Sequence, residues 1–377
     1  MSMEKMAIPF SIPYASDLSK KYVLEALNGR HQQGDGPFSK RAANIISSLV
    51  GGGEVLMTPS CTHALEMASM LAGIEPGDEV IMPSFTFTSA ATAITQFGGV
   101  PVFIDIEPSS LGINAALIEN AITPKTKAIS WVNYAGHAPN IELIMDIASK
   151  HDLITIEDNA HGLGATYKGK PLGSFGDFST LSFHSTKNLQ CGEGGAIVIN
   201  KRQYLEKALI IREKGTNRHE LISGKVQKYN WVGKGSSYLL AEALAAVLTG
   251  QLEEFDKLQK IREDNWKQIE IFMEKIDKYK RIIKHDSEDK GSFHMFALEF
   301  EDENKRLKFQ DSLAVNNVIA NTHYEPLHNS VAGSNYGRAE GSMEQTLSIS
   351  SKILRLPLWT IHMGKVFEAY GNALKHV

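Results

Sequence analysis

Between Glu79 and Asn200, short apolar runs alternate with segments of helical spacing, and this alternation constrains the fold more than any other feature. Strands that alternate with helices are typical of a mainly parallel sheet whose faces are covered by helices. The apolar runs predict strands at residues 79–82, 102–106, 128–132, 153–157, 180–183 and 196–199. Apolar residues three and four apart predict helices over 89–97 and 141–151. The expected fold class is therefore α/β.

The pattern changes after Ser236. Residues 238–276 carry apolar positions at helical spacing with Glu and Lys on the other face, and they predict one long connecting helix. Further along, the sequence predicts strands over 293–300 and 318–324 and helices over 304–315, 346–354 and 364–375. We therefore expect two domains, a large one over residues 1–250 and a smaller α+β one over 251–377 that begins with the connecting helix.

The composition argues against several classes of protein. With 39 Lys and Arg against 43 Asp and Glu, the net charge is -4, which gives no electrostatic reason to bind nucleic acid or a membrane surface. Two cysteines, Cys61 and Cys191, are too few for a disulfide framework. The first residues lack the apolar segment of a secretory signal, and no stretch reaches the roughly 20 apolar residues of a membrane helix. We expect a cytoplasmic protein.

The densest group of reactive side chains spans residues 181–188 (LSFHSTKN) and precedes a glycine turn at 192–195 (GEGG). A lysine between a strand and a glycine turn can be held rigidly and partly desolvated. Desolvation lowers the pKa of a lysine and makes its amine nucleophilic, as a bond to an aldehyde cofactor requires. Taken alone, Lys187 would more often be a solvated surface lysine. The surrounding segment and the glycine turn favour the interpretation of Lys187 as a nucleophile.

Upstream, a predicted strand ends in residues 157–162 (EDNAHG). An acid at the carboxyl end of a buried strand lies where open α/β sheets bind ligands. Asp158 could pair there with a protonated pyridine nitrogen and keep the ring an electron sink, or it could cap a helix or loop. His161 could touch the phenolic oxygen of such a ring or cap the same turn.

Two further segments fit the same cofactor. Residues 58–66 (TPSCTHALE) place small polar residues before a helix, and free amides and hydroxyls at a helix start suit a phosphate. Thr62 could equally be an ordinary N-cap. Residues 82–88 (MPSFTFT) run from a strand into a loop with two aromatics. One of them could stack on a flat ring, or both could belong to the core.

Taken together, these segments resemble the DegT-type sugar aminotransferase family, whose members are pyridoxal 5'-phosphate (PLP) enzymes of the aspartate aminotransferase fold, fold type I. The resemblance begins near Ile8 and continues into the C-terminal region in the family's motif order. It implies a large mixed-sheet domain with a smaller α+β C-terminal domain. It also implies PLP as the cofactor, with pyridoxamine 5'-phosphate (PMP) during turnover, and a homodimer with the active site at the subunit interface.

The resemblance implies roles for the residues around the cofactor ring. Lys187 would form the internal aldimine with PLP and carry the proton between the amino-acid carbon and the cofactor. Asp158 would pair with the pyridine nitrogen, and His161 would lie against the ring or its 3' oxygen. Phe87 would stack on the ring.

The resemblance also implies which residues hold the phosphate of the cofactor. They are Cys61 and Thr62 at the helix start and the hydroxyl of Ser182. Many family members have an asparagine that reaches the phosphate from the second subunit, and this chain has Ser237 at that position. A serine hydroxyl can bind a phosphate at shorter reach or through water.

Other segments resemble one subgroup, the aminotransferases that act on C4 of dTDP-4-keto-6-deoxyglucose. They are 60–62 (SCT), 211–218 (IREKGTNR), 228–229 (KY) and 235–239 (GSSYL). Residues 323–328 (HYEPLH) are similar to the family's substrate-side segment, and 34–37 (GDGP) to its N-terminal active-site loop. The resemblance implies that Arg218, Tyr324 and His328 bind substrate. We expect no metal ion, because neither the spacing of these histidines nor further ligands support one.

The implied reaction transfers an amino group from L-glutamate to C4 of a nucleotide-linked 4-keto-6-deoxyhexose. The expected acceptor is dTDP-4-dehydro-6-deoxy-D-glucose, and the product would be a dTDP-4-amino-4,6-dideoxyhexose for surface polysaccharide or lipopolysaccharide O-antigen. Two alternatives stay open, a 3-aminotransferase for a 3-keto sugar nucleotide and a non-catalytic PLP-binding regulator. A 3-dehydratase of the family typically has histidine in place of Lys187. The galacto or gluco configuration and the nucleotide base also stay open.

Overall fold

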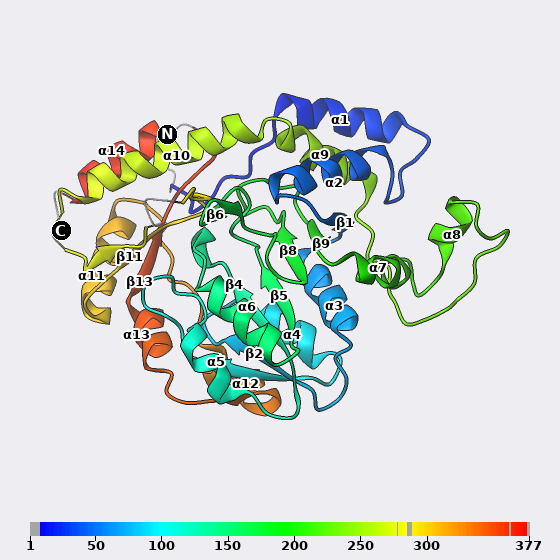
Figure 1. Cartoon of the computed structure of the whole chain (residues 1–377). Coiled ribbons are helices and arrows are strands. Elements are labelled where there is room, and N and C mark those ends of the chain that lie inside the picture. The colour runs from blue at the N-terminus through cyan, green and yellow to red at the C-terminus, as the bar shows by residue number, and fades with distance from the viewer. Residues whose placement is uncertain (1–7, 277, 285–288, 362, 375–377) are drawn as a thin grey trace.

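The computed structural model describes residues 8–276, 278–284, 289–361 and 363–374. Within these residues, eight strands form one sheet in the order β1-β9-β8-β5-β4-β2-β3-β12 (Figure 1). The strands are β1 (Glu54–Thr58), β2 (Glu79–Pro83), β3 (Val100–Ile104), β4 (Thr126–Val132), β5 (Ile154–Asp158), β8 (Phe178–Ser182), β9 (Gly195–Ile199) and β12 (Arg338–Ala339). Two short strands, β6 (Thr166–Tyr167) and β7 (Lys170–Pro171), pair with each other.

The large sheet is mixed and mainly parallel. β8, β5, β4, β2, β3 and β12 pair in parallel, whereas β9 pairs antiparallel with both β8 and β1. The predicted α/β fold with a mainly parallel sheet is confirmed, and a strand forms in each of the six predicted places. β3 ends at Ile104, before the predicted residue 106, and Ile106 makes only an isolated bridge with Ile113. The carboxylate of Asp105 between them accepts the backbone N–H of Thr346 at 2.8 Å. β1 was not predicted.

Helices cover both faces of the large sheet, as the alternating side chains of the strands require. Val80 and Met82 pack on one face with the helix over residues 61–72, whereas Ile81 packs on the opposite face with the helix over 141–150. The helices in this part are α1 (Asp17–Asn28), α2 (Pro37–Leu49), α3 (Cys61–Ala72), α4 (Thr88–Thr95), α5 (Ile118–Ala121), α6 (Ile141–Lys150), α7 (Leu205–Arg212), α8 (Arg218–Ile222) and α9 (Glu242–Leu252). In Figure 1, α8 stands away from the body of the molecule.

A second, antiparallel sheet has the order β10-β11-β13 within the described residues. Its strands are β10 (Arg281–Ile282), β11 (Phe296–Glu299) and β13 (Ile353–Leu356). The remaining helices are α10 (Phe255–Met273), α11 (Glu303–Val315), α12 (Val331–Tyr336), α13 (Glu344–Lys352) and α14 (Gly364–Leu374). One core joins this sheet to α10, α11 and α14 through Trp266, Phe309 and Tyr370. The expected smaller α+β part is confirmed.

Three predicted elements were wrong in detail. The single helix over 238–276 is two helices, because the chain leaves helical geometry at Glu254, so that α9 packs on α1 and α2 while α10 packs on the small sheet. Residues 318–324 make only isolated bridges, from Val318 to Ile8 and from Asn321 to Arg355, and form no strand ladder. The helix predicted over 346–354 ends at Lys352, where the chain becomes β13.

The two sheets meet through a shared apolar cluster. Phe85 and Val132 from the large sheet side pack with Met295, Ala297 and Ile353 from the small sheet side. β12 belongs to the C-terminal half of the chain but extends the large sheet next to β3. We keep the division into residues 1–250 and 251–377 as a proposal.

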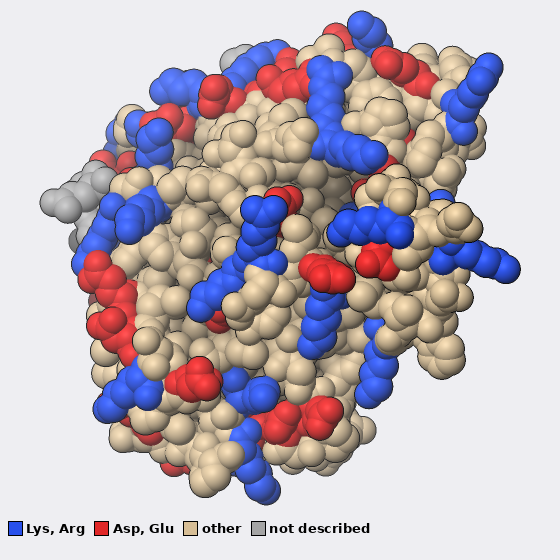
Figure 2. Space-filling view, turned by 45° about the vertical axis from the view of Figure 1, so that its right-hand side comes forward, with Lys and Arg blue, Asp and Glu red and all other residues tan. Residues whose placement is uncertain are grey.

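The surface carries charges of both signs. On the face turned forward in Figure 2, Lys and Arg side chains are interspersed with Asp and Glu. None of the helices within the described residues is long and apolar enough to cross a lipid bilayer.

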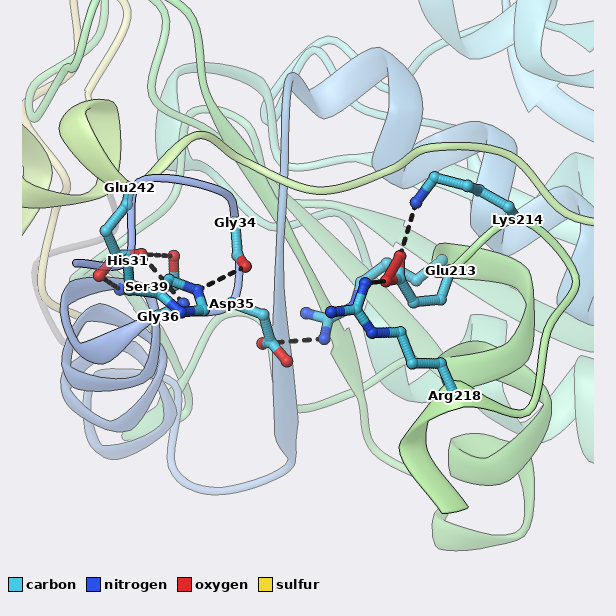
Figure 3. A network of polar contacts seen from close by, with 10 residues as sticks. His31, Gly34, Asp35, Gly36, Ser39, Glu213, Lys214, Arg218 and Glu242 are labelled. Atoms are coloured by element: carbon cyan, nitrogen blue, oxygen red, sulfur yellow. Dashed lines mark hydrogen bonds and ion pairs between the residues drawn. The ribbon is translucent and has the colours of Figure 1, made fainter. Parts of the chain in front are cut away.

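The N-terminus of α2 is capped by a buried carboxylate that belongs to another helix. The N-cap residue Gly36 makes no side-chain capping bond, and a side chain there would collide with Glu242. Glu242 is fully buried and accepts the backbone N–H groups of Gly36, Phe38 and Ser39 and the hydroxyl of Ser39 (Figure 3). Because Glu242 begins α9, this contact ties the start of α2 to α9.

We predict that Glu242→Ala lowers the free energy of unfolding by about 2 to 3 kcal/mol, because it leaves several buried amides without an acceptor. Urea unfolding followed by circular dichroism measures the change. Glu344→Ala, which removes an exposed carboxylate from the first turn of α13, is the matched control and should leave the midpoint unchanged. Equal midpoints for both variants would contradict the structural role of Glu242.

Candidate active site

A cavity of about 640 Å³ lies where the carboxyl ends of β5 and β8 face the small sheet. The sequence analysis singled out eight of the residues that line it, from five separate segments of the chain. They are Cys61, Thr62, Phe87, Asp158, His161, Ser182, Lys187 and Tyr324. The fold therefore brings together in one place most of the residues expected to contact the cofactor.

Lys187 lies in a tight loop between β8 and β9. Its backbone N–H donates to the carbonyl of His184 at 2.8 Å, and the loop is closed by a bond from the Ser185 amide to the Gly192 carbonyl at 2.9 Å. Gly192 has φ +85, a left-handed conformation that favours glycine. Burial lowers the pKa of the Lys187 amine to about 8, while the nearby Cys61 and Asp158 oppose this shift. About a tenth of the amine is therefore neutral at pH 7, far more than for a lysine of ordinary pKa.

Two adjacent carboxylates at the end of β5 have different surroundings. Glu157 is fully buried and accepts hydrogen bonds from the side chain of Asn133 and from the amides of Gly173, Phe175 and Gly176. Asp158 points into the cavity and accepts the Ala160 amide at 3.1 Å. Burial raises the pKa of Asp158, and the Ala160 amide and the charge of Lys187 oppose this. Asp158 is thus the carboxylate that a cation in the cavity would stabilise.

His161 is buried in a group of aromatic rings on the cavity wall. The Ala135 amide donates to its Nδ1 at 3.3 Å, so the proton of the neutral ring is on Nε2, which lies 3.4 Å from the Tyr324 hydroxyl. Burial lowers the pKa of His161 well below its ordinary value, so the ring is neutral. His294 stacks on it with ring centroids 4.4 Å apart. These contacts fix the tautomer and orientation of His161.

The start of α3 also lines the cavity and is suited to an anion. α3 begins at Cys61, and the Ser60 hydroxyl accepts the His63 amide at 3.2 Å, leaving the first amides of the helix without partners inside it. A Cβ at Gly195 would lie 2.3 Å from the Ser60 backbone carbon, so only glycine lets β9 pass this close to the helix start. Ser182, paired with Gly195, and Thr62 line the same end.

The two aromatic residues after β2 have separate positions. Phe85 is fully buried and belongs to the cluster between the sheets. Phe87 is 57% exposed at the start of α4 and lines the cavity, with its ring centroid 6.2 Å from that of Tyr324. Of the pair, Phe87 is the one available to a flat ligand ring.

Three predicted residues lie outside the lining of this cavity. Arg218 begins α8 and pairs with Glu213 at 2.8 Å (Figure 3). Ser237 is exposed and bridges to the same Glu213. His328 bonds through Nδ1 to the Ser84 hydroxyl at 2.6 Å. Arg218 and Ser237 belong to an extension of the chain that leads to and from α8 (Figure 1).

The cavity also contains polar residues to which the sequence analysis gave no role. Arg355 comes from β13 and His294 from the segment before β11, and both line the wall that the small sheet provides. Arg355 stands between apolar Leu354 and Leu356, as in a strand with one polar face. This pattern does not indicate what the arginine side chain faces.

A sequence profile of the DegT/DnrJ/EryC1/StrS aminotransferase family matches residues 14–365. The chain belongs to this family. The GDP-perosamine synthase of Caulobacter vibrioides is 33% identical over 68% of the chain and 67% of its own length. A protein of Geobacillus stearothermophilus named pleiotropic regulatory protein is 33% identical over 79% of the chain and 78% of its own length.

Solved structures agree with this assignment. A sugar aminotransferase from Streptococcus pneumoniae in its PMP-form superimposes with a TM-score of 0.89 at 25% identity, covering 98% of this chain and 99% of that one. The same protein was also solved in a PLP-form. The expected sugar aminotransferase family, fold type I and PLP as the cofactor are thereby confirmed, and the protein is a PLP-dependent aminotransferase.

The cavity fits PLP on its own chemistry. A lysine amine with a lowered pKa suits an aldehyde, the buried carboxylate of Asp158 suits a protonated pyridine nitrogen, and the start of α3 suits a phosphate. The three lie around one cavity that is large enough for the cofactor and a small substrate.

We predict that the rate at which the apoenzyme captures PLP rises with pH and levels off above about 8, the pKa of Lys187, because only the neutral amine attacks an aldehyde. Stopped-flow absorbance of PLP over a pH series measures this rate. Lys187→Arg, which keeps the charge but offers no such amine, should show no covalent capture at any pH. A midpoint at 10.5, the ordinary value for lysine, would contradict the lowered pKa.

Proposed function

We propose that the protein transfers the amino group of L-glutamate to C4 of a nucleotide-linked 4-keto-6-deoxyhexose, specifically dTDP-4-dehydro-6-deoxy-D-glucose. The product would be a dTDP-4-amino-4,6-dideoxyhexose for surface polysaccharide or lipopolysaccharide. The observation that carries the proposal is the meeting of the Lys187 amine, the buried Asp158 carboxylate and the start of α3 in one cavity.

PLP, when bound, supplies an aldehyde carbon and a ring that accepts electrons from the donor's α-carbon. We propose that Lys187 holds the aldehyde end and that Asp158 holds the pyridine nitrogen as a salt bridge. His161, whose tautomer is fixed by the Ala135 amide, would lie against the ring or its 3' oxygen. Phe87 would cover one face of the ring.

We propose that the phosphate of PLP is held by Cys61, Thr62 and Ser182 at the start of α3. The Thr62 hydroxyl bonds to that of Ser89 at 2.7 Å, and this contact orients the Thr62 side chain at the cavity. Burial raises the pKa of the Cys61 thiol, so it remains neutral and does not repel a phosphate. The Cys61 thiol therefore adds no negative charge of its own to the anion site at the helix start.

Lys187 is also the proposed proton carrier. An amine with a pKa of about 8 can both accept and release a proton near neutral pH, which suits the two halves of an amino transfer. The loop bonds fix the backbone of Lys187 at the cavity wall, from which its side chain would reach the donor. Tyr324 lies beside His161 on the cavity wall, and we propose that it contacts the sugar.

The proposal includes a homodimer with the active site at the subunit interface, and a cytoplasmic location. Ser237 and Arg218 lie on the extension around α8 and outside the cavity of their own chain. An interface would bring them to the cavity of a second subunit, where Ser237 would reach the phosphate and Arg218 the substrate. For His328, whose Nδ1 is engaged by Ser84, we propose a substrate contact through the remaining ring nitrogen.

Different observations support the general class of the acceptor and its specific identity. Family membership and the relative named GDP-perosamine synthase support a nucleotide-linked sugar. The dTDP-linked 4-keto sugar is supported by sequence segments 60–62, 211–218, 228–229 and 235–239. The relative's name contains GDP, so the nucleotide base has to be tested separately from the position of the ketone.

One relative carries the name pleiotropic regulatory protein, which is the single point in favour of a non-catalytic PLP-binding regulator, whereas the family and the solved structures favour the aminotransferase. A regulator would bind PLP without consuming an amino donor. Adding L-glutamate to the yellow PLP-loaded protein separates the two, since an aminotransferase loses the colour and a regulator keeps it.

We predict that the purified enzyme, given L-glutamate, aminates dTDP-4-keto-6-deoxyglucose faster than its 3-keto isomer or the GDP-linked 4-keto sugar. Mass spectrometry and NMR of the product identify the aminated carbon and its configuration. Lys187→Ala should abolish multiple turnovers, because it removes both the amine that holds PLP and the proton carrier. Amination at C3, preference for the GDP sugar, or turnover by the Lys187→Ala variant would each contradict a stated part of the proposal.

A further inference from the structure

The side chain of Asn188, the residue after Lys187, bonds to the small-sheet side of the site. Its Nδ2 donates to the carbonyl of Ser292 at 2.7 Å, and its Oδ1 lies 2.9 Å from Nδ1 of His294. Both partners come from the segment that leads into β11. The proposed reaction as described so far gives neither Asn188 nor His294 a role.

These two bonds determine the tautomer of His294. A backbone carbonyl can only accept, so the Asn188 amide presents its NH2 group to Ser292 and its oxygen to His294. Burial lowers the pKa of His294 well below its ordinary value, so its ring is neutral and has a single N–H. That N–H is therefore on Nδ1, where it donates to the Asn188 oxygen.

The ring of His294 is itself held from two directions. On the side of α10, Arg262 donates to the backbone carbonyl of His294 at 2.6 Å. On the large-sheet side, the Ser292 hydroxyl donates to the carbonyl of Ala135 at 3.2 Å, and the amide of Ala135 donates to His161. His161 stacks on His294 with an angle of 23° between the rings. His294 is therefore a fixed point to which the Asn188 side chain is attached.

A hollow next to Lys187 leaves its loop dependent on hydrogen bonds. This hollow has a volume of about 20 Å³, and Lys187, Asn188, His161 and His294 all line it. Side chains beside a hollow lack van der Waals partners on one side, so packing alone does not fix where they lie. Before the lysine, the loop is closed by the backbone bond to His184. After the lysine, the Asn188 side chain attaches the loop to the small-sheet segment.

We propose that His294 is a positioning residue for the Lys187 amine, and that it acts by donating to Asn188 and so fixing the loop directly after the lysine. An amine attacks an aldehyde only from a narrow range of distances and angles, so a small shift of the loop slows the attack. The inference rests on the proposed role of Lys187. It adds a residue from the small-sheet side that acts on the lysine through the loop.

The test makes two measurements on the apoenzyme. Covalent capture of PLP is followed by stopped-flow absorbance on the plateau of its pH profile, and the affinity for PMP is measured by calorimetry. PMP has an amine in place of the aldehyde, so it needs the ring and phosphate contacts but no bond to a lysine. His294→Phe keeps a ring for stacking and loses the N–H. We expect it to capture PLP about 3- to 10-fold more slowly, as loss of one neutral hydrogen bond predicts, and to bind PMP as the wild type does.

Two further variants separate the hydrogen bond from the ring. His294→Asn provides an amide N–H near the position of Nδ1 without a ring, and its capture rate should lie closer to the wild type than that of His294→Phe. Asn188→Ala loses both bonds and should be slower than His294→Phe. Combining Asn188→Ala with His294→Phe should slow capture no further, because the histidine acts through Asn188.

Asn265→Ala is the matched control. Asn265 is buried and also bonds to backbone carbonyls of the small-sheet part, those of Trp359 and Ile361. It lies outside the lining of both hollows. Its loss should lower the urea midpoint and leave PLP capture and PMP affinity at their wild-type values.

The possible outcomes are distinct. Unchanged capture in His294→Phe overturns the inference, and so does a loss of PMP affinity equal to the loss of capture rate, which would indicate a general disturbance of the site. Faster capture by His294→Phe than by His294→Asn also overturns it, since the ring would then matter more than the bond. Multiplied effects in the double variant contradict action through Asn188.

Failure of the proposed role of Lys187 gives a different result. In that case the wild-type apoenzyme captures no PLP, or Lys187→Arg captures it as the wild type does. Asn188→Ala decides by the same two measurements if a His294 variant does not fold, and the two His294 variants decide if Asn188→Ala does not.

Discussion

Burial of the Lys187 amine at the carboxyl ends of β5 and β8 lowers its pKa to about 8, and the site is built around this burial. A lysine tolerates such a position only where the backbone holds it and where opposing charges limit the penalty. The loop bonds between Phe183 and Gly194 supply the first condition. Asp158 supplies the second, because its charge favours the protonated amine while the amine favours the ionised carboxylate.

The sheet topology explains why these groups meet. β5 and β8 are parallel neighbours, so Asp158 and Ser182 leave the sheet at the same edge. β9 runs back antiparallel, and Gly195 at its start lets α3 approach closely enough to direct its first amides at the cavity. The small sheet closes the other side and contributes Arg355. The cavity is thus lined by the start of α3 and, from β13, by the cationic side chain of Arg355.

Much of this arrangement could be predicted from the chain because its determinants are local. The apolar runs of β2, β4 and β5 and the polar residues that follow them are contiguous in sequence, and so is the loop that contains Lys187. The break at Glu254 was not predictable in this way, since helix-favouring residues flank it on both sides and only packing on two different cores separates α9 from α10. The place of Arg355 in the cavity depends on which way β13 faces, and this is a property of the tertiary fold. Residues 318–324 failed as a strand because no neighbour pairs with them continuously.

The central claim is that Lys187 is the residue to which PLP becomes bonded. Reducing the PLP-loaded enzyme with borohydride and mapping the labelled peptide tests it most directly, because reduction makes the bond permanent before digestion. The account predicts one pyridoxyl group, on Lys187. A label on another lysine, or no label on a protein that still contains PLP, would contradict it.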